Sequence, residues 1–430
     1  MMHNKNFLSI PSGPALGKVE EVANKTNAWF AWTIAYLIVD FARPQGLLHL
    51  EALRPGMATI LVLAGYCLSR GCFYFNVPTI RILWFFLFLL TVHVPFAHNN
   101  FWAYKTAESF LLFFPFILSI LYCVVTLRRL ILLVDIIIST MAYMSIWGLL
   151  HGGRGGGGYF TDENDLALFV VFVMPFCYFL LFSGAKKTKK VFYLATLLIG
   201  LAAIVATRSR GGIVGLCVIT IGIWLFSKRK VVSLVLIGVL AAFMVFLGDA
   251  KYWQEMATAA DPNESTASAR LESWVSGWRM FLDNPLGVGG NNFLVRFPEY
   301  QTEWFKRGMW GRVAHSIWFT LIPELGIPGI ILYLSLTIKN FKNIFLLQRL
   351  PIDEKSPDSY LKALPPAFIC SILGYFACGT FLSVLYYPYY WYLTAIIVIA
   401  VRLGQEAVEH KGSSAILKPV TRIVAGGEAV

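Results

Sequence analysis

The chain has 430 residues, of which 57% are hydrophobic and 14% are charged. An ordinary soluble domain is about 25% charged, so this composition excludes a soluble globular protein and predicts a membrane protein. The net charge of +12 does not indicate a nucleic-acid partner, because the sequence contains no soluble basic domain. Basic runs such as Lys186–Lys190 instead predict contacts with anionic membrane lipids.

The apolar runs predict an all-α polytopic membrane protein with about twelve transmembrane helices. A helix needs about 20 apolar residues to cross the hydrocarbon core, and lipid excludes an open sheet. The predicted spans centre near residues 35, 60, 88, 117, 140, 173, 199, 219, 240, 328, 374 and 395. The first two are weak, because Asp40 lies within the first and the run after Pro55 is short. The polar residues 1–26 show no cleavable signal pattern.

Lysine and arginine placement predicts the orientation of these spans. With the N-terminus inside, 23 of the 36 basic residues lie in inner segments and six lie in short outer loops. The other seven lie in one long outer loop, to which the rule does not apply. We therefore expect spans 1–9 in residues 1–249, a long outer loop with amphipathic helices in 250–314, spans 10–12 in 315–404, and a cytoplasmic tail in 405–430.

Residues Ser265 to Asp283 of the long loop have the spacing of an amphipathic helix. The apolar positions are Leu271, Trp274, Val275, Trp278, Phe281 and Leu282, and Asn284-Pro285 ends the pattern. A tryptophan-rich helix of this kind is expected to lie at a bilayer interface. Arg270 stands four residues before Trp274, where it would either anchor the helix to headgroups or contact a lipid-linked phosphate.

Glycines dominate the segment His151–Phe160, which predicts a mobile loop. Thr161 or Asp162 is expected to cap the helix that follows. The acidic residues 162, 163 and 165 favour a solvated cap over a metal site, because no histidine or cysteine pattern accompanies them. The aromatic run at 386–392 predicts an interfacial belt, with sugar stacking as a second role.

Arg210 lies just before an apolar run that begins near Gly211. Helix N-termini bind anions, Gly211 and Gly212 would allow close approach, and a guanidinium group suits phosphate oxygens. The alternative is an arginine whose side chain reaches the outer headgroup layer. Arg208 is a weaker candidate of the same kind.

His315 opens another apolar run. A neutral imidazole can accept a proton from an attacking hydroxyl, although a lone interfacial histidine is more often a hydrogen-bonded surface group. Glu324 follows nine residues later, about 13 Å along a helix axis, so the two cannot touch on one straight helix. We expect Glu324 to be a buried structural acceptor, and Gly326 and Gly329 to allow close helix packing.

Four short segments resemble the O-antigen ligase and polymerase superfamily of bacterial membrane glycosyltransferases. They are residues 162–167 (DENDLA), 209–212 (SRGG), 269–274 (ARLESW) with 284–289 (NPLGVG), and His315 followed by 324–329 (ELGIPG). Together they cover roughly residues 150 to 335, and their order is more specific than any one of them. The family's usual R-x-x-x-L form reads Arg210 to Val214 here, which leaves open whether Arg208 or Arg210 contacts phosphate.

The resemblance implies an enzyme of the bacterial inner membrane whose active site faces the periplasm. Such an enzyme moves a glycan from undecaprenyl diphosphate to a hydroxyl acceptor, here first of all lipid A–core. The resemblance implies Arg210 and Arg270 on the diphosphate, and His315 at the acceptor hydroxyl as base or orienter. Arg208 and Asn164 are predicted as further substrate contacts. Because the diphosphate leaving group supplies the energy, neither ATP nor a nucleotide sugar is expected. Attack in a single displacement would invert the anomeric carbon. No metal and no cofactor are expected, because two guanidinium groups would stabilise the leaving group and no metal-ligand cluster is present.

Three alternatives stay open at this stage. An O-antigen polymerase or a protein O-glycosylation ligase would use the same donor chemistry. A transporter or flippase of a lipid-linked anion would use the same arginines for binding, but it should expose its site to both faces from mid-membrane. The sequence does not identify the glycan, the acceptor or the oligomeric state.

Overall fold

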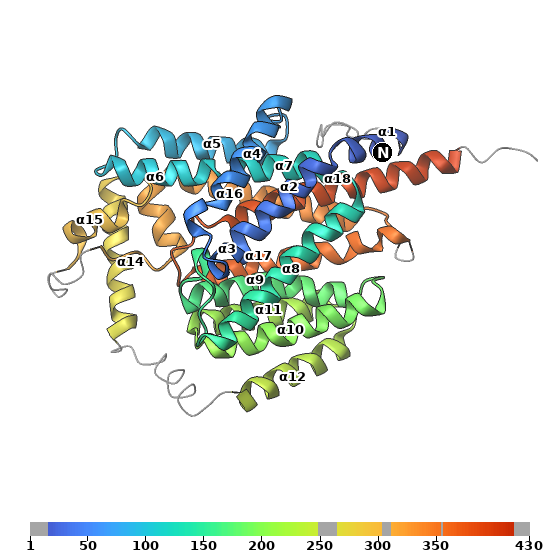
Figure 1. Ribbon diagram of the computed structural model, residues 1–430. Helices are drawn as coiled ribbons and strands as arrows, with labels where there is room; N and C mark the ends of the chain where they lie inside the picture. Colours follow the sequence, from blue (N-terminus) through green and yellow to red (C-terminus); the bar gives the residue numbers. More distant parts are fainter. Residues whose placement is uncertain (1–15, 248–264, 303–310, 354–355, 417–430) are drawn as a thin grey trace, which may run out of the picture.

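The computed structural model describes residues 16–247, 265–302, 311–353 and 356–416 (Figure 1). All regular secondary structure in these ranges is helical. In chain order the elements are α1 (Leu16–Lys25), α2 (Asn27–Leu37), the π-helical turn η1 (Ile38–Ala42), α3 (Pro44–Leu47), η2 (Glu51–Leu53), α4 (Pro55–Arg70), α5 (Pro78–His93), α6 (Asn100–Leu111), α7 (Phe113–Cys123), α8 (Leu127–Leu150), η3 (Gly158–Phe160), α9 (Glu163–Leu181), α10 (Lys187–Thr207), α11 (Arg210–Phe226), α12 (Lys230–Leu247), α14 (Ser265–Asp283), α15 (Phe293–Tyr300), α16 (Ile317–Arg349), η5 (Pro357–Ser359), α17 (Tyr360–Gly379) and α18 (Pro388–Ile416).

Each of the twelve predicted span centres lies within one of these helices. Seven of the described helical segments are long and apolar enough to cross a membrane, so the protein is a polytopic membrane protein. They are Asn100–Cys123, Leu127–Leu150, Glu163–Leu181, Lys187–Thr207, Ile317–Arg349, Tyr360–Gly379 and Pro388–Glu409. Helices α5 and α11 are apolar but shorter. The total of twelve spans therefore stays a prediction.

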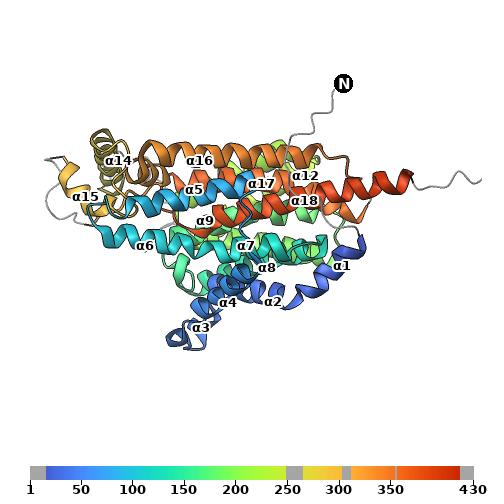
Figure 2. The ribbon, with the colours of Figure 1, turned by 90° about the horizontal axis from the view of Figure 1, so that it is seen from above.

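The two ends of the helical bundle differ. Helices α14 and α15 lie at one end, and α1 and the C-terminal part of α18 lie at the other (Figures 1 and 2). The predicted topology requires this separation, because it assigns the long loop and the two termini to opposite sides. We call the first of these the α14 end. Which end faces the cytoplasm, and the predicted domain boundaries, remain predictions.

Helix α9 forms the centre of the bundle. Every residue from Asp165 to Leu180 is buried, and the helix contacts α8, α10, α11 and α17. A helix that is apolar on all sides is stable only when it is covered on all sides. Glycines in α11 permit the close approach of its neighbours. A Cβ atom at Gly212 would lie 2.7 Å from Cβ of Ala167 in α9, and one at Gly215 would lie 2.1 Å from Sγ of Cys378 in α17.

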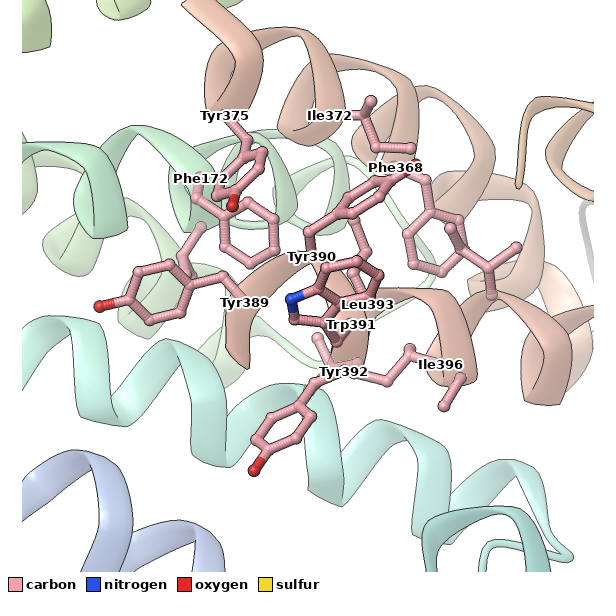
Figure 3. Packing of buried hydrophobic residues seen from close by; sticks show 14 of the residues in the cluster. Phe172, Phe368, Ile372, Tyr375, Tyr389, Tyr390, Trp391, Tyr392, Leu393 and Ile396 are labelled. Atoms are coloured by element: carbon pink, nitrogen blue, oxygen red, sulfur yellow. The ribbon is translucent and has the colours of Figure 1, made fainter. Parts of the chain in front are cut away.

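The aromatic run near the start of α18 is not the interfacial belt that its composition predicts. Residues Tyr389, Tyr390, Trp391 and Tyr392 are at most 4% exposed and lie among other rings inside the bundle (Figure 3). Tyr390 stacks on Tyr375 of α17 with 5.7 Å between ring centroids. Because α18 begins at Pro388, the helix carries these rings directly into the core. The prediction of a belt was wrong for these four residues.

Helix α16 is interrupted at Gly326, whose φ of 60° and ψ of −159° are not helical. Backbone groups that lose their helical hydrogen bonds at this break bond instead to the loop between α14 and α15. The amide of residue 288 donates to the carbonyl of residue 323, that of 289 donates to 324, and that of 327 donates to 285, each at 2.9 Å. A Cβ atom at Gly326 would lie 2.4 Å from the carbonyl oxygen of Pro285. Gly326 therefore serves this backbone contact, and not the helix–helix packing expected of it.

The side chain of Glu324 also binds the segment between α14 and α15. Its carboxylate accepts hydrogen bonds from the amides of Asn291 (2.9 Å) and Phe293 (3.2 Å) and from the hydroxyl of Tyr386 (2.7 Å). The side chain is 2% exposed. The prediction that Glu324 is a buried structural acceptor is confirmed.

The break at Gly326 yields a stability prediction. We expect Gly326→Ala to lower the free energy of unfolding by at least about 2 kcal/mol, because the left-handed conformation is strained and the added methyl group collides with backbone. Gly65→Ala in α4 is the matched control, since a Cβ atom there has no neighbour within 4 Å among the described residues. That control should gain about 0.5 kcal/mol. Unfolding in mixed detergent micelles measures both, and equal stability of the two variants would contradict the role of Gly326.

Candidate functional site

Helix α14 occupies Ser265–Asp283, the range that the sequence predicts. Its buried face combines the fully buried Ser273 and Ser276 with Met280, which packs in a small apolar cluster with Phe293 and Phe297. The large apolar residues Leu271, Val275, Trp278 and Leu282 are instead 46–61% exposed. The apolar stripe therefore faces away from the protein, as a helix lying on a bilayer interface requires. Contact with lipid itself stays a prediction.

The buried face of α14 is attached to the segment that precedes α16. Nε of Arg312 donates a hydrogen bond to Oγ of Ser273 at 2.8 Å. Nε1 of Trp274 donates to the carbonyl of Ala314 at 3.1 Å, and the Trp274 ring stacks on Phe319 with 5.4 Å between centroids. These contacts bring the helix that carries Arg270 against the segment that ends in His315.

His315 precedes α16 and does not open it. The helix begins at Ile317 after the N-cap residue Ser316, whose Oγ accepts from the amide of Phe319 at 3.5 Å. His315 has a φ of 46°, in the left-handed region that non-glycine residues rarely adopt. Such strain is retained where the surroundings fix the backbone, and this occurs often at functional sites.

The electrostatic surroundings of His315 are strongly cationic. Burial, Arg312 and Arg270, in this order, lower the pKa of the imidazole from 6.5 to about 4, and Asp162 partly opposes them. Burial and Arg270 also lower the pKa of Arg312. The half-buried imidazole is therefore neutral at pH 7 and lies within electrostatic reach of two guanidinium groups.

Arg210 is the first residue of α11, and a polar network fixes the turn before it. Oγ of Ser209 accepts from the amide of Gly212 at 3.0 Å and donates to Oδ1 of Asn164 at 2.7 Å. Oδ1 of Asp162 in turn accepts from the backbone amide of Asn164 at 2.7 Å and from its side-chain Nδ2 at 2.6 Å. The amide of Gly212 therefore donates to the N-cap side chain, and the absence of a side chain at Gly212 allows close packing against Ala167. This corrects the prediction that Gly212 opens the helix start to an anion.

Two connections join Arg210 to the neighbourhood of His315. The first is Asp162, which bonds to Asn164 and also acts electrostatically on His315. The second is Phe381, whose ring centroid lies 6.3 Å from that of Trp274. A Cβ atom at Gly211, the residue after Arg210, would lie 3.6 Å from Cβ of the same Phe381. Arg270 and His315 therefore belong to one electrostatic cluster, and the turn before Arg210 adjoins it through Asp162 and Phe381. Convergence of all three side chains on one site stays a prediction.

The two predicted substrate-binding residues occupy supporting positions. Arg208 is the C-cap of α10, with a φ of 51°, and stands two residues before Arg210. Asn164 has both ends of its side-chain amide engaged by Asp162 and Ser209. Its geometry suits positioning of the Arg210 turn, while direct substrate contact by either residue stays a prediction.

Sequence reasoning missed Arg312. It lies three residues before His315 and forms part of the same cationic cluster. Its position in a long loop, where basic residues carry no topological information, hid it among seven arginines and lysines. The short spacing to His315 was the one available signal.

The acidic residues near the start of α9 each have a separate partner. Asp162 caps the helix, which confirms one of the two predicted caps. Glu163 forms an ion pair with Arg154 at 2.7 Å, and Asp165 accepts from the hydroxyl of Tyr387 at 3.3 Å. In the part of the chain that the structure describes, no group of three or more His, Cys, Asp or Glu side chains could hold a metal ion.

A family model described as "O-Antigen ligase" matches residues 195–334. The match runs from α10 into the first half of α16 and contains the candidate residues Arg208, Arg210, Arg270 and His315. No curated protein matches the chain significantly. Residues 195–334 therefore constitute an O-antigen ligase family domain within a polytopic membrane protein.

Proposed function

We propose that the protein transfers a glycan from undecaprenyl diphosphate to a hydroxyl acceptor, lipid A–core first of all, at the periplasmic face of the bacterial inner membrane. The observation that carries the proposal is the cluster of Arg270, Arg312 and His315 inside the O-antigen ligase family domain. The cluster unites cations suited to a diphosphate with a neutral proton acceptor.

The arginines have the properties that a diphosphate leaving group requires. Negative charge grows on the leaving oxygen as the glycosidic bond breaks, and fixed cations in a site with little water stabilise it most strongly. Arg210 and Arg270 are assigned to the diphosphate, with Arg312 as a further contact. The apolar stripe of α14 faces outward beside Arg270, so it would lie against the polyprenyl chain or the surrounding lipid.

His315 is assigned to the acceptor. One ring nitrogen takes the proton of the acceptor hydroxyl. At the same time the oxygen of that hydroxyl forms a bond to the anomeric carbon. The bond between that carbon and the diphosphate oxygen breaks, and its electron pair leaves with undecaprenyl diphosphate. A single displacement of this kind inverts the anomeric configuration. The reaction needs no nucleotide, because the diphosphate ester supplies the driving force.

The charge balance around His315 favours donor binding before proton transfer. Arg312 and Arg270 hold the pKa of the free imidazole low, which makes it a weak base. A bound diphosphate brings negative charge that offsets these cations, so the pKa of His315 should rise toward its ordinary value. The base therefore gains strength when the donor is present.

The competing class is a transporter or flippase of a lipid-linked anion. Its site should lie at mid-membrane, whereas Arg270 belongs to α14, at one end of the bundle, and acts electrostatically on His315. His315→Ala separates the two classes. If this variant still transfers glycan in membranes supplied with donor and acceptor, the catalytic role of His315 is wrong.

Variants of the arginines test the donor contacts. We expect Arg210→Gln and Arg270→Gln each to lower the transfer rate about 100-fold, because one stabilising contact to the leaving group is lost. Arg279→Gln is the matched control, since Arg279 lies exposed on the same helix as Arg270. Proteoliposomes that contain undecaprenyl-diphosphate-linked O-antigen and lipid A–core provide the assay. An equal loss in the control would show that net charge, and not the site, governs the rate.

The pH dependence tests the role of His315. The dependence of kcat/KM for the donor reports the free protein, and that of kcat reports the donor complex. Because the pKa of His315 is about 4 in the free protein and should rise when donor binds, kcat should fall at higher pH than kcat/KM as the solution is acidified. Arg312→Gln should move the acid limb of kcat/KM to higher pH, because the pKa of His315 rises when this cation is removed. Coincident limbs in the wild type would contradict the proposed base.

The same shift has a consequence for folding. The folded-state pKa lies below the ordinary value of 6.5, so His315 lowers stability as the pH falls from 6.5 toward 4. The acid limbs must therefore be measured where circular dichroism shows an intact fold.

The product in cells that lack the gene identifies the acceptor. Loss of long glycan from lipid A–core, with accumulation of lipid-linked polymer, would indicate a ligase. Single unpolymerised units on the core would indicate a polymerase. Loss of glycan from a protein, with normal lipopolysaccharide, would indicate a protein O-glycosylation ligase.

A further inference from the structure

A polar cavity lies outside the O-antigen ligase family domain. It has a volume of about 500 Å³ and is bordered by η1, α3 and the starts of α4 and η3. Its polar lining consists of Asp40, Arg43, Gln45, Arg54 and Tyr159. We call it the Asp40 cavity. The predicted first spans gave no indication of it beyond the unusual position of Asp40 in an apolar run.

Two oxygen atoms in this lining are poorly satisfied. Oδ2 of Asp40 and Oε1 of Gln45 are buried, and neither accepts a hydrogen bond from any residue that the structure describes. The other end of the Gln45 amide is fixed, because Nε2 donates to the carbonyl of Val39 at 3.0 Å. Buried acceptors are normally paired, so two together in one cavity wall require an explanation. Both residues line the cavity, so their oxygens are the candidate acceptors for donor groups of a ligand.

The backbone around the cavity is also unusual. The segment Ile38–Ala42 is a π-helical turn, and Arg43 and Arg54 have φ values of 49° and 45°. Both π-helical turns and left-handed non-glycine residues are frequent at functional sites. Here they direct two guanidinium groups to the same cavity as the carboxylate.

The mixture of donors and acceptors selects one ligand chemistry. A phosphate group presents acceptors alone, and the carboxylate of Asp40 would repel it. A sugar hydroxyl both donates and accepts, so it can bond to Asp40 or Gln45 and also receive a bond from Arg43 or Arg54. Tyr159 also lines the cavity, and an aromatic side chain can pack against the carbon face of a sugar. The lining therefore fits a saccharide better than a phosphate.

The glycine-rich segment connects this cavity to the candidate site. Gly158 and Tyr159 form its wall at one end of the segment. At the other end, a Cβ atom on Gly153 would lie 2.5 Å from the carbonyl oxygen of Ala206. That contact lies against the last turn of α10, four residues before Arg210. One loop thus borders both the Asp40 cavity and the turn that presents Arg210.

We propose that the Asp40 cavity binds the saccharide of a substrate through hydrogen bonds from sugar hydroxyls to Asp40 and Gln45. The assignment to a substrate rests on the proposed function. The acceptor and the donor both carry sugars, and their shared hydroxyl chemistry is what the cavity would recognise.

Asp40→Asn tests this proposal with little change in shape. The probes are core oligosaccharide released from lipid A–core and O-antigen oligosaccharide released from the donor, and each is titrated against the full-length protein in nanodiscs. Saturation-transfer NMR then measures binding. We expect about tenfold weaker binding of one probe, because a charged hydrogen-bond acceptor is lost. The probe that loses affinity identifies the acceptor or the donor as the source.

A stability measurement distinguishes recognition from a structural role. Asp40→Asn removes a buried charge, so its thermal unfolding midpoint should equal or exceed that of the wild type. Asp283→Asn, an exposed residue of α14, is the matched control and should change neither binding nor stability. Unchanged binding of both probes to Asp40→Asn would overturn the proposal, as would a lower midpoint with unchanged binding. Gln45→Leu gives a second, uncharged test with the same expectation for binding.

The outcomes separate this inference from the proposed function. If the wild type transfers glycan and Asp40→Asn binds both probes normally, the cavity assignment fails and the transfer function stands. If the wild type transfers no glycan and Asp40→Asn still loses affinity for a probe, the cavity is a saccharide site of a protein with another activity.

Discussion

The break in α16 at Gly326 fixes the arrangement on which the candidate site depends. A helix that opens in an apolar bundle leaves backbone donors and acceptors without partners, and each unpaired group costs about 1–3 kcal/mol. Here the loop of residues 285–289 takes up those groups, and the carboxylate of Glu324 binds two further amides beyond it. This loop begins immediately after α14 ends. The position of α14, and so of Arg270, is set by a contact made with α16.

The same arrangement explains why part of the buried face of α14 is polar. Its attachment to the segment before α16 uses side-chain hydrogen bonds and one aromatic stack, whereas its large apolar residues point outward. A soluble protein would bury such a stripe, and a large exposed apolar patch marks an interaction surface. In a membrane protein the stripe is free to contact lipid. Under the proposed function, Arg270 then lies where a polyprenyl chain in the bilayer meets its diphosphate.

The sequence predicted local structure well, because local structure follows from local pattern. The apolar spacing over Ser265–Asp283 and the Asn-Pro that follows gave the bounds of α14. The resemblance at residues 150 to 335 largely coincides with the family match at 195–334. The capping role of Asp162 and the burial of Glu324 also followed from residue type and spacing.

Features that depend on distant contacts were not accessible in this way. Helical spacing shows that one face is apolar, but it does not show whether protein or lipid covers it. Aromatic residues suit a bilayer interface and a packed core equally well, so composition could not place Tyr389–Tyr392. Glycine is required at positions 212 and 326 because residues far along the chain, such as Ala167 and Pro285, pack closely against them. The place of Arg312 in the cationic cluster could not be predicted, because it depends on a hydrogen bond to Ser273 and on the electrostatic influence of Arg270.

Under the proposed function, the cationic cluster couples the strength of the base to the presence of the donor. A base beside two guanidinium groups is weak, so the proposed base His315 would do little to activate water or hydroxyl groups before donor binds. The diphosphate itself supplies the charge that strengthens the base. Water is then the competitor only while donor is bound and the acceptor is absent. Selective transfer requires that the acceptor be held before it reaches the anomeric carbon, and a saccharide site connected by the glycine-rich segment to the Arg210 turn would meet that requirement.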